Sequence, residues 1–254
     1  MRTFSLSGRS LLNRPFSCIM DRERNSLWPT ATMTQSALGI LSKSVRVTPY
    51  SCSATAASAQ GSAKLQGKDF IFIAIFGLLL FIVFFAFAMI LGMNANTLWF
   101  THAIGAIPGG IVWMYLAARV PKPGAAIVMS VIVAVVGLLL GMLWTGPAGI
   151  VVGGVLAEII MTAGKRSKAA VIAAFAVWTL CFWLGQESMV FLAGGSYVDM
   201  VVQSGMSREY GETLVGFMQS PLIIVAGVLC VVGPIVGGLL GSKIFNKHFA
   251  RIAA

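Results

Sequence analysis

The sequence contains few charged residues. Only 10% of its 254 residues are Asp, Glu, Lys or Arg, whereas 57% are hydrophobic. None of the four charged types occurs between Phe70 and Ala118. A soluble globular domain carries about 25% charged residues, so this composition excludes that class and predicts a polytopic membrane protein. Its membrane spans leave little room for a second, water-soluble domain.

The sequence also lacks the signatures of enzymes and of metal or nucleotide sites. Its four cysteines show no CxxC spacing, neither HExxH nor GxSxG occurs, and the two histidines, His102 and His248, are expected at opposite membrane faces. The segment 61–68 resembles a phosphate-binding loop, but Asp69 stands where Ser or Thr is required. We therefore expect a protein that is not an enzyme and has no metal or cofactor, with any ATP used by partner subunits only.

Residues 1–66 differ in composition from the rest of the chain. Ser, Thr, Ala and Arg are common there, and apolar periodicity is absent. Such a segment cannot bury enough surface to offset its ordering entropy, so we expect disorder. A targeting peptide is one interpretation, although Asp21 and Glu23 disfavour it. We favour a dispensable tail, with the true start at Met20 or Met33.

Six apolar stretches predict six transmembrane helices. A bilayer core of about 30 Å is crossed by about 20 helical residues. The predicted spans, within a membrane domain of residues 67–254, are residues 70–93, 99–118, 124–143, 148–163, 169–192 and 221–245. A polar segment, residues 194–220, separates the last two spans.

The basic residues indicate how the chain is oriented. In the connections between spans and at the ends of the membrane domain, one side of the membrane receives only Arg208. The other side receives ten basic residues: Lys64, Lys68, Arg119, Lys122, Lys165, Arg166, Lys168, Lys243, Lys247 and Arg251. The positive-inside rule therefore predicts an all-α protein with both termini in the cytoplasm. Because the basic residues lie in short clusters between apolar runs, we expect no nucleic-acid partner.

Small residues recur four positions apart in several predicted spans. In lipid, helices associate through close approach at such residues, because lipid tails are as apolar as leucine. The pairs and ladder are Gly105 and Gly109, Gly149 and Gly153, and Gly233, Gly237 and Gly241. We expect them to pack helices within this one chain rather than to form a dimer interface.

Glu158 is the only carboxylate deep within a predicted span. An ionisable group in the membrane is costly and requires a partner. Lys165 lies about two turns further along the same helix face, so it or another basic residue of the following turn can approach Glu158. Two interpretations stay open, namely a structural ion pair near the cytoplasmic surface and a coupling contact with a partner protein. A proton relay is disfavoured, because no second carboxylate or membrane histidine accompanies Glu158.

Polar and aromatic residues gather at the predicted outer ends of the helices. A small-molecule pocket combines apolar and aromatic walls with a few convergent polar groups, and this set has that composition. The alternative is that the aromatic residues are ordinary interface residues and that the asparagines form turns. The predicted substrate-binding residues, under the loops 94–99 and around 144, are Asn94, Asn96, Trp99, His102, Trp144, Gln186, Glu187 and Tyr197.

Several short motifs carry a family resemblance through their order and spacing. They are Lys68-Asp69-Phe70, Gly109-Gly110-Ile-Val, Gly154-Val-Leu-Ala-Glu158, Gly205-Met206 with Glu209-Tyr210 and Thr213-Leu214, Gly233-Pro-Ile-Val-Gly237-Gly238-Leu-Leu-Gly241, and Lys247-His248-Phe249. Together they resemble the MptD family of S components of energy-coupling factor (ECF) transporters. The resemblance covers about residues 67–251.

This resemblance implies a six-helix capture subunit in the bacterial plasma membrane. It would bind a vitamin-like or other micronutrient at its outer face and dock on a transmembrane T component driven by two ATPases. S components commonly dock through Ala-xxx-Ala in the first helix, but here Leu78 follows Ala74. The expected docking residues are Ala74 and Gly77 of this helix, together with Glu158, the candidate coupling contact. A self-sufficient channel or facilitator is the alternative function.

Overall fold

The computed structural model describes residues 64–252, so the expectation for residues 1–66 lies almost entirely outside the described residues. All regular structure in the described part is helical. The elements are α3 (Gly67–Leu91), α4 (Ala95–Leu98), α5 (Thr101–Arg119), α6 (Ala125–Leu139), α7 (Thr145–Ala163), α8 (Lys168–Ala193), η2 (Gly194–Ser196), α9 (Tyr197–Gln203), α10 (Arg208–Gln219) and α11 (Leu222–Ile252).

Six of these helices form the membrane domain. Five helical stretches within the described residues are long and apolar enough to cross a membrane, and α6 is a shorter apolar helix of 15 residues. The all-α fold with six membrane helices is therefore confirmed. One span is shorter than predicted, because the expected third span reached residue 143 whereas α6 ends at Leu139.

A local backbone feature ends α6 early. Gly141 has a φ of 86°, which a glycine adopts without steric cost. The amide of Met142 donates to the carbonyl of Gly137 at 2.9 Å, as in a Schellman motif. Apolar residues continue past this point, so composition alone does not reveal the stop.

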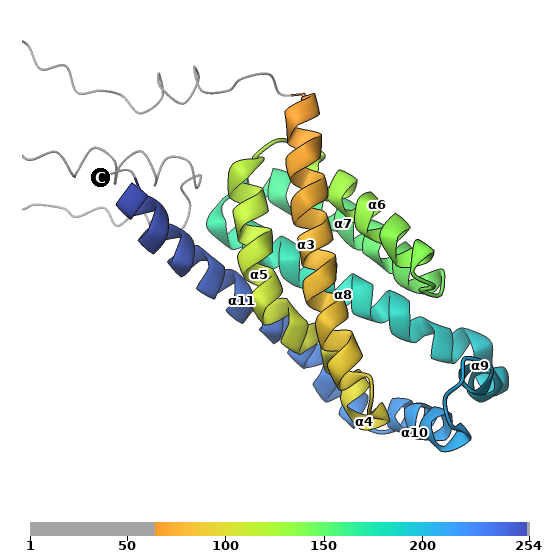
Figure 1. The fold of residues 1–254 in the computed structure, drawn as a ribbon. Helices are drawn as coiled ribbons and strands as arrows, with labels where there is room; N and C mark the ends of the chain where they lie inside the picture. Colours follow the sequence, from red (N-terminus) through yellow and green to blue (C-terminus); the bar gives the residue numbers. More distant parts are fainter. Residues whose placement is uncertain (1–63, 253–254) are drawn as a thin grey trace, which may run out of the picture.

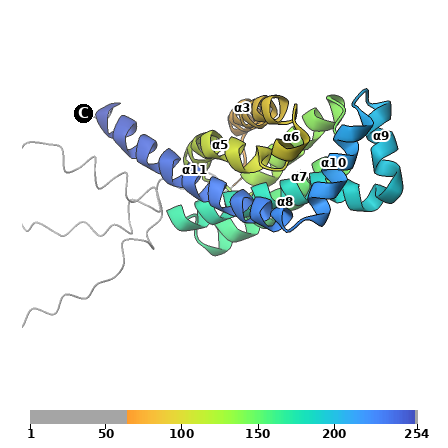
Figure 2. The same cartoon turned by 90° about the horizontal axis from the view of Figure 1, so that it is seen from below.

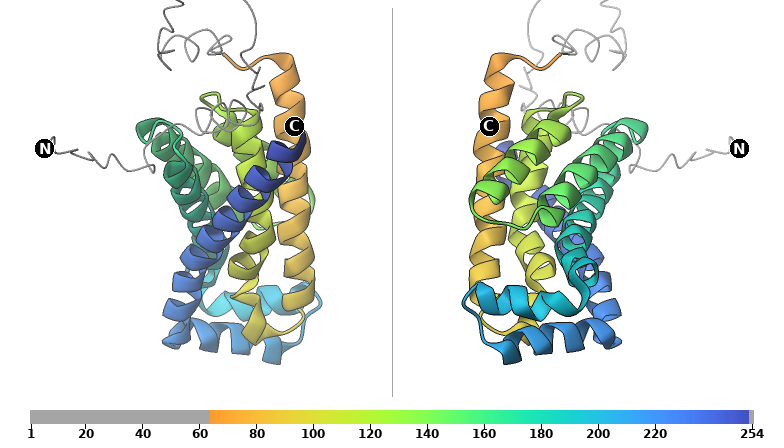
Figure 3. Two further views of the ribbon diagram at one scale, coloured as in Figure 1. Left: turned by 90° about the vertical axis from the view of Figure 1, so that its left-hand side faces the viewer. Right: turned by 90° about the vertical axis from the view of Figure 1, so that its right-hand side faces the viewer.

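The helices alternate between two ends of the molecule. α3 runs from one end to the other and α5 returns beside it (Figure 1). The start of α3, the basic α5–α6 and α7–α8 turns and the end of α11 lie at one end. At the opposite end α9 and α10 lie side by side across the helix ends, with α4 close by (Figures 2 and 3). The positive-inside rule makes the first of these the cytoplasmic end and the second the outer end.

Glycines bring two helix pairs into backbone contact. A Cβ added to Gly237 of α11 would lie 2.3 Å from the carbonyl oxygen of Ala106 on α5. A Cβ on Gly149 of α7 would lie 2.4 Å from the carbonyl oxygen of Cys181 on α8. Side chains larger than glycine therefore do not fit at these crossings without a backbone shift. The prediction that the small-residue pairs pack helices within the chain is confirmed.

Aromatic side chains fill the centre of the bundle. Phe175 and Trp178 of α8 are fully buried, and Trp113 of α5 stacks on Phe175 with ring centroids 5.1 Å apart. The indole N–H groups are satisfied across helices, since Trp178 donates to Ser130 Oγ at 2.9 Å and Trp113 donates to the Val171 carbonyl at 3.1 Å. The middle of the bundle is thus closely packed and its indole donors are paired, in contrast to the outer end.

Candidate functional site

One face of α8 carries polar groups toward the outer end of the bundle. Ser167 caps the start of this helix, with its hydroxyl accepting from the Ala170 amide at 3.3 Å. Thr179, Trp183 and Glu187 then follow at intervals of four, so they lie along one side of the helix. All three are buried. α8 therefore holds a carboxylate inside the protein, about two turns beyond a buried hydroxyl.

His102 lies on the first turn of α5 and faces the same region. Its ring meets the Phe182 ring edge to face, with centroids 4.4 Å apart and an interplanar angle of 90°. The side chain of Gln186, also on α8, lies near the imidazole. His102 is only 4% exposed, and its Nδ1 has no hydrogen-bond partner. The imidazole is thus fixed on one side by α8 and carries an unpaired nitrogen.

Trp99 connects the α4–α5 turn to the helices around it. The Trp183 indole donates to the Trp99 carbonyl at 3.2 Å, and the Trp99 ring stacks on Phe217 of α10 at 5.2 Å between centroids. The ring is fully buried, yet its own indole N–H lacks a partner. Trp99 therefore places an unpaired donor in the same region as the groups of α5 and α8.

The helices α9 and α10, here called the cover, close the outer end. Ser207 caps α10 by accepting from the Tyr210 amide at 3.1 Å, and the Tyr210 hydroxyl donates to the Gly92 carbonyl at 2.6 Å. Glu187 interacts electrostatically with Tyr197 of α9 and Tyr210 of α10. Burial, and secondarily the Glu187 charge, raises the pKa of Tyr210. The cover thus rests over the Glu187 carboxylate.

We call Trp99, His102, Gln186, Glu187, Tyr197 and Tyr210 the outer cluster. Three of its buried polar atoms have no hydrogen-bond partner: Trp99 Nε1, His102 Nδ1 and Glu187 Oε1. Leaving a buried polar group unpaired costs about 1–3 kcal/mol, and more when the group is charged. Folded proteins pair most such groups, so three in one region call for a functional explanation. The arrangement suits a small molecule that supplies the missing partners.

The structure brings together five of the eight predicted substrate-binding residues. These are Trp99, His102, Gln186, Glu187 and Tyr197. The other three are exposed: Asn94, Asn96 and Trp144. Asn94 caps α4, since its Oδ1 accepts from the Asn96 amide at 2.9 Å, so these asparagines form a turn. The α6–α7 turn, which carries Trp144, ends short of the cover (Figure 3). Ligand contact remains a prediction for all eight.

Four further residues of this region were not predicted from the sequence as site residues. They are Thr179, Trp183, Tyr210 and Cys230. Thr179 and Trp183 precede Glu187 by eight and four residues, so helical spacing from Glu187 is the signal that identifies them. Cys230 comes from α11, and no local pattern places it beside Glu187.

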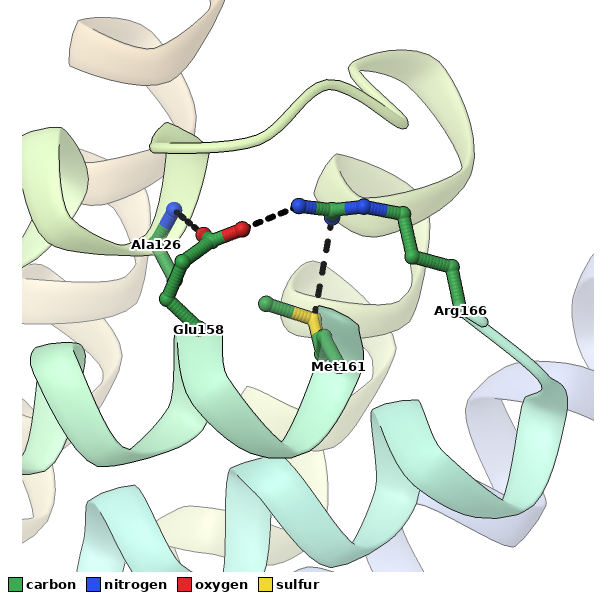
Figure 4. A network of polar contacts seen from close by, with 4 residues as sticks. All are labelled: Ala126, Glu158, Met161 and Arg166. Carbon is green, nitrogen blue, oxygen red and sulfur yellow. Dashed lines mark hydrogen bonds and ion pairs between the residues drawn. The ribbon is translucent and has the colours of Figure 1, made fainter. Parts of the chain in front are cut away.

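Glu158 is satisfied at the cytoplasmic end, as Figure 4 shows. Its carboxylate pairs with Arg166 and accepts a hydrogen bond from the Ala126 amide at 3.1 Å. Ala126 is the second residue of α6, where a negative charge also interacts favourably with the helix dipole. The structural ion pair is therefore confirmed, with Arg166 as the partner, while Lys165 is exposed. A coupling contact through Glu158 remains a prediction.

The turn that carries Arg166 has an unusual backbone conformation. Lys165 and Arg166 have φ values of 49° and 51°, in the left-handed region that side-chain-bearing residues rarely adopt. Such conformations cost of order 1–3 kcal/mol and persist where other contacts compensate. The ion pair with Glu158 is one such contact, so the turn and the carboxylate stabilise each other.

The predicted docking residues of α3 differ in accessibility. Gly77 is buried against α6, and a Cβ added to it would lie 3.1 Å from Met129 Cγ. Ala74 is partly exposed, and much of the rest of α3 faces outward. Ala74 is thus accessible from outside the chain, whereas α6 already covers Gly77.

Comparison with known proteins gives one match. The family described as hypothetical bacterial integral membrane protein (Trep_Strep) matches residues 67–251. The chain belongs to this family. The matched region begins at the first residue of α3 and ends one residue before the end of α11, so it coincides with the six-helix domain. The protein is thus a multi-pass bacterial membrane protein. No curated protein and no solved structure matches the chain.

Proposed function

We propose that the chain is the substrate-binding S component of an ECF-type importer. It captures a small micronutrient or vitamin-like molecule at its outer face and passes it inward through a shared T component and two ATPases. The observation that carries the proposal is the outer cluster, where Trp99, His102 and Glu187 have unpaired buried polar atoms beneath the cover.

The composition of the outer cluster supports capture of a small molecule. Aromatic rings, including Trp99 and the neighbouring Phe182, supply apolar contact area, and the indole, imidazole and carboxylate supply directional contacts. Binding sites for small molecules combine these two kinds of surface. The position at the outer end suits uptake from outside the cell.

Two features of the chain support the proposed partner subunits. The chain contains no nucleotide-binding loop, so ATP-driven import requires separate ATPases. α3 offers a surface for a membrane partner, because only 28% of its most apolar window is buried within the chain. Ala74 is a small residue on this helix, and small residues permit the close approach on which helix association in lipid depends.

Co-purification tests the proposal directly. When the chain is expressed with the T component and two ATPases of its own bacterium, we expect a complex of all four. Ala74→Trp should weaken this complex, whereas Ile90→Trp, on the opposite side of α3 and already 68% exposed, should not. Isolation of the chain alone under every such condition would refute the assignment.

The channel or facilitator alternative makes a different prediction. A self-sufficient channel would move its substrate across proteoliposomes that contain only this chain and no ATP. The S component should give transport only when the T component, the ATPases and ATP are also present. If the purified chain retains a small molecule, native mass spectrometry identifies it as the substrate to use in this assay.

A further inference from the structure

We infer that the molecule captured at the outer cluster is a small organic cation whose positively charged nitrogen binds Glu187. This inference rests on the proposed function and names its substrate class. It starts from a carboxylate that is only 7% exposed and whose Oε1 has no hydrogen-bond partner. A buried carboxylate stays ionised only when a cation or several donors pair with it, because its loss of hydration is otherwise uncompensated and the neutral acid is favoured.

The protein does not supply that cation among its described residues. The described ion pairs are Lys122 with Asp69, Arg166 with Glu158, and Arg208 with Asp199. Arg208 is the only Lys or Arg in the outer connections, and its pair with Asp199 lies on the exposed surface. Glu187 is therefore left without a fixed positive partner.

The groups that surround Glu187 are neutral side chains at ordinary pH, apart from the titratable His102. α9 and α10 contribute Tyr197 and Tyr210, and α11 contributes Cys230. Gln186, also neutral, lies near His102. In its ionised form Glu187 attracts a cation and repels an anion, because few other charges lie close enough to offset it.

Aromatic rings make the same region suitable for an organic cation. Trp99 and Trp183 are both buried, and the Trp183 indole donates to the Trp99 backbone carbonyl. Tyr197 and Tyr210 lie near the carboxylate. The negative faces of such rings attract ammonium and amidinium groups. The unpaired Trp99 N–H adds a donor, which suits an acceptor atom elsewhere on the same molecule.

A bare metal ion fits the region less well than an organic cation. Among the described residues no group of three or more His, Cys, Asp or Glu side chains could hold a metal. Divalent cations such as Ca²⁺ require six or more oxygen ligands, and Glu187 is a single carboxylate. The surroundings are aromatic, which favours a protonated amine or heterocycle.

Three probes of similar size and different charge test the inference. The full chain, purified in a neutral detergent, is titrated with benzylamine, benzyl alcohol and benzoate at neutral pH by isothermal calorimetry. We expect benzylamine to bind about tenfold or more tighter than benzyl alcohol, in line with a charge-assisted hydrogen bond, and benzoate to bind most weakly. Glu187→Gln should remove the preference for benzylamine and leave benzyl alcohol unaffected. Glu209→Gln, an exposed outer carboxylate, is the matched control and should change nothing.

Several results would overturn the inference: benzylamine binding no tighter than benzyl alcohol, preferred binding of benzoate, no measurable benzylamine binding, or an unchanged preference in Glu187→Gln. The comparison of probes on the unaltered chain decides the question even if the variant does not fold. A chain that joins the T component and ATPases but prefers benzoate would lose the cation class and keep the capture function. A chain that prefers benzylamine but forms no such complex would keep the cation class and lose the assignment as an S component.

Discussion

Two glutamates of this protein differ in their surroundings although their burial is equal. Glu158 and Glu187 are each 7% exposed, one near the cytoplasmic end and the other near the outer end. Glu158 has Arg166 and the Ala126 amide as partners, whereas Glu187 Oε1 has none. Removing a carboxylate from water is costly at both sites, but only the cytoplasmic site contains the groups that compensate for it.

This difference matches the structural role of Glu158 and the binding role that we propose for Glu187. The contacts of Glu158 connect three parts of the chain, since Glu158 lies on α7, Ala126 on α6, and Arg166 in the turn before α8. Glu187 lies beneath the cover among aromatic rings. The polar groups of a binding site stay unpaired until the ligand binds, and the protein loses some stability for that reason.

Replacing Glu158 by methionine should have the largest effect on stability. The substitution keeps the length of the side chain but leaves Arg166 and the Ala126 amide without their partner. Loss of one member of a buried ion pair costs about 3–5 kcal/mol, and we expect the lower end because Arg166 is partly exposed. The thermal unfolding midpoint in detergent should fall accordingly. Arg208→Ala, which breaks an exposed pair, should cost less than about 1 kcal/mol.

The same substitution at Glu187 should act in the opposite direction. Glu187→Met removes an unpaired buried carboxylate and replaces it with an apolar group of similar size. We expect a gain of about 1–3 kcal/mol in the free energy of unfolding and a loss of benzylamine binding. A decrease in stability as large as that of Glu158→Met would show that Glu187 has a structural partner, and the contrast between the two sites would then fail.

The sequence predicted much of the cytoplasmic end because its features are local. Glu158 and the basic turn after it are separated by one or two helical turns, so spacing alone brings them together. The membrane helices follow from apolar runs, which require no knowledge of the tertiary fold. The end of α6 was missed because Gly141 stops the helix within an apolar sequence.

The outer end was predicted less completely because it is assembled from distant segments. His102 and Gln186 were both chosen as candidates, but their contact joins α5 to α8. The sequence of the cover is polar overall, although Gly211, Leu214 and Met218 recur at helical spacing and are buried on one face of α10. Only the fold reveals that this face packs against Trp99 and Trp183.

Loosening the cover should have a smaller effect than either glutamate substitution. Tyr210→Phe removes the hydrogen bond from α10 to the Gly92 carbonyl at the end of α3, which is worth about 0.5–1.5 kcal/mol. Hydrogen exchange measured by mass spectrometry should become faster in residues 197–219 and stay unchanged in residues 145–163. Ser204→Ala, which removes only a local exposed bond, is the control. Equal exchange in both variants would show that the Tyr210 hydroxyl does not hold the cover.

The smallest expected effect is electrostatic and concerns the same tyrosine. Burial is the main cause of the raised pKa of Tyr210, and the charge of Glu187 is the second. Glu187→Gln removes a nearby negative charge that opposes formation of the phenolate, so the pKa of Tyr210 should fall but stay above its ordinary value. Ultraviolet absorbance titration, with Tyr210→Phe to identify the signal, measures this shift. Glu158→Gln, at the opposite end of the bundle, should leave it unchanged, because Glu158 lies far from the cover.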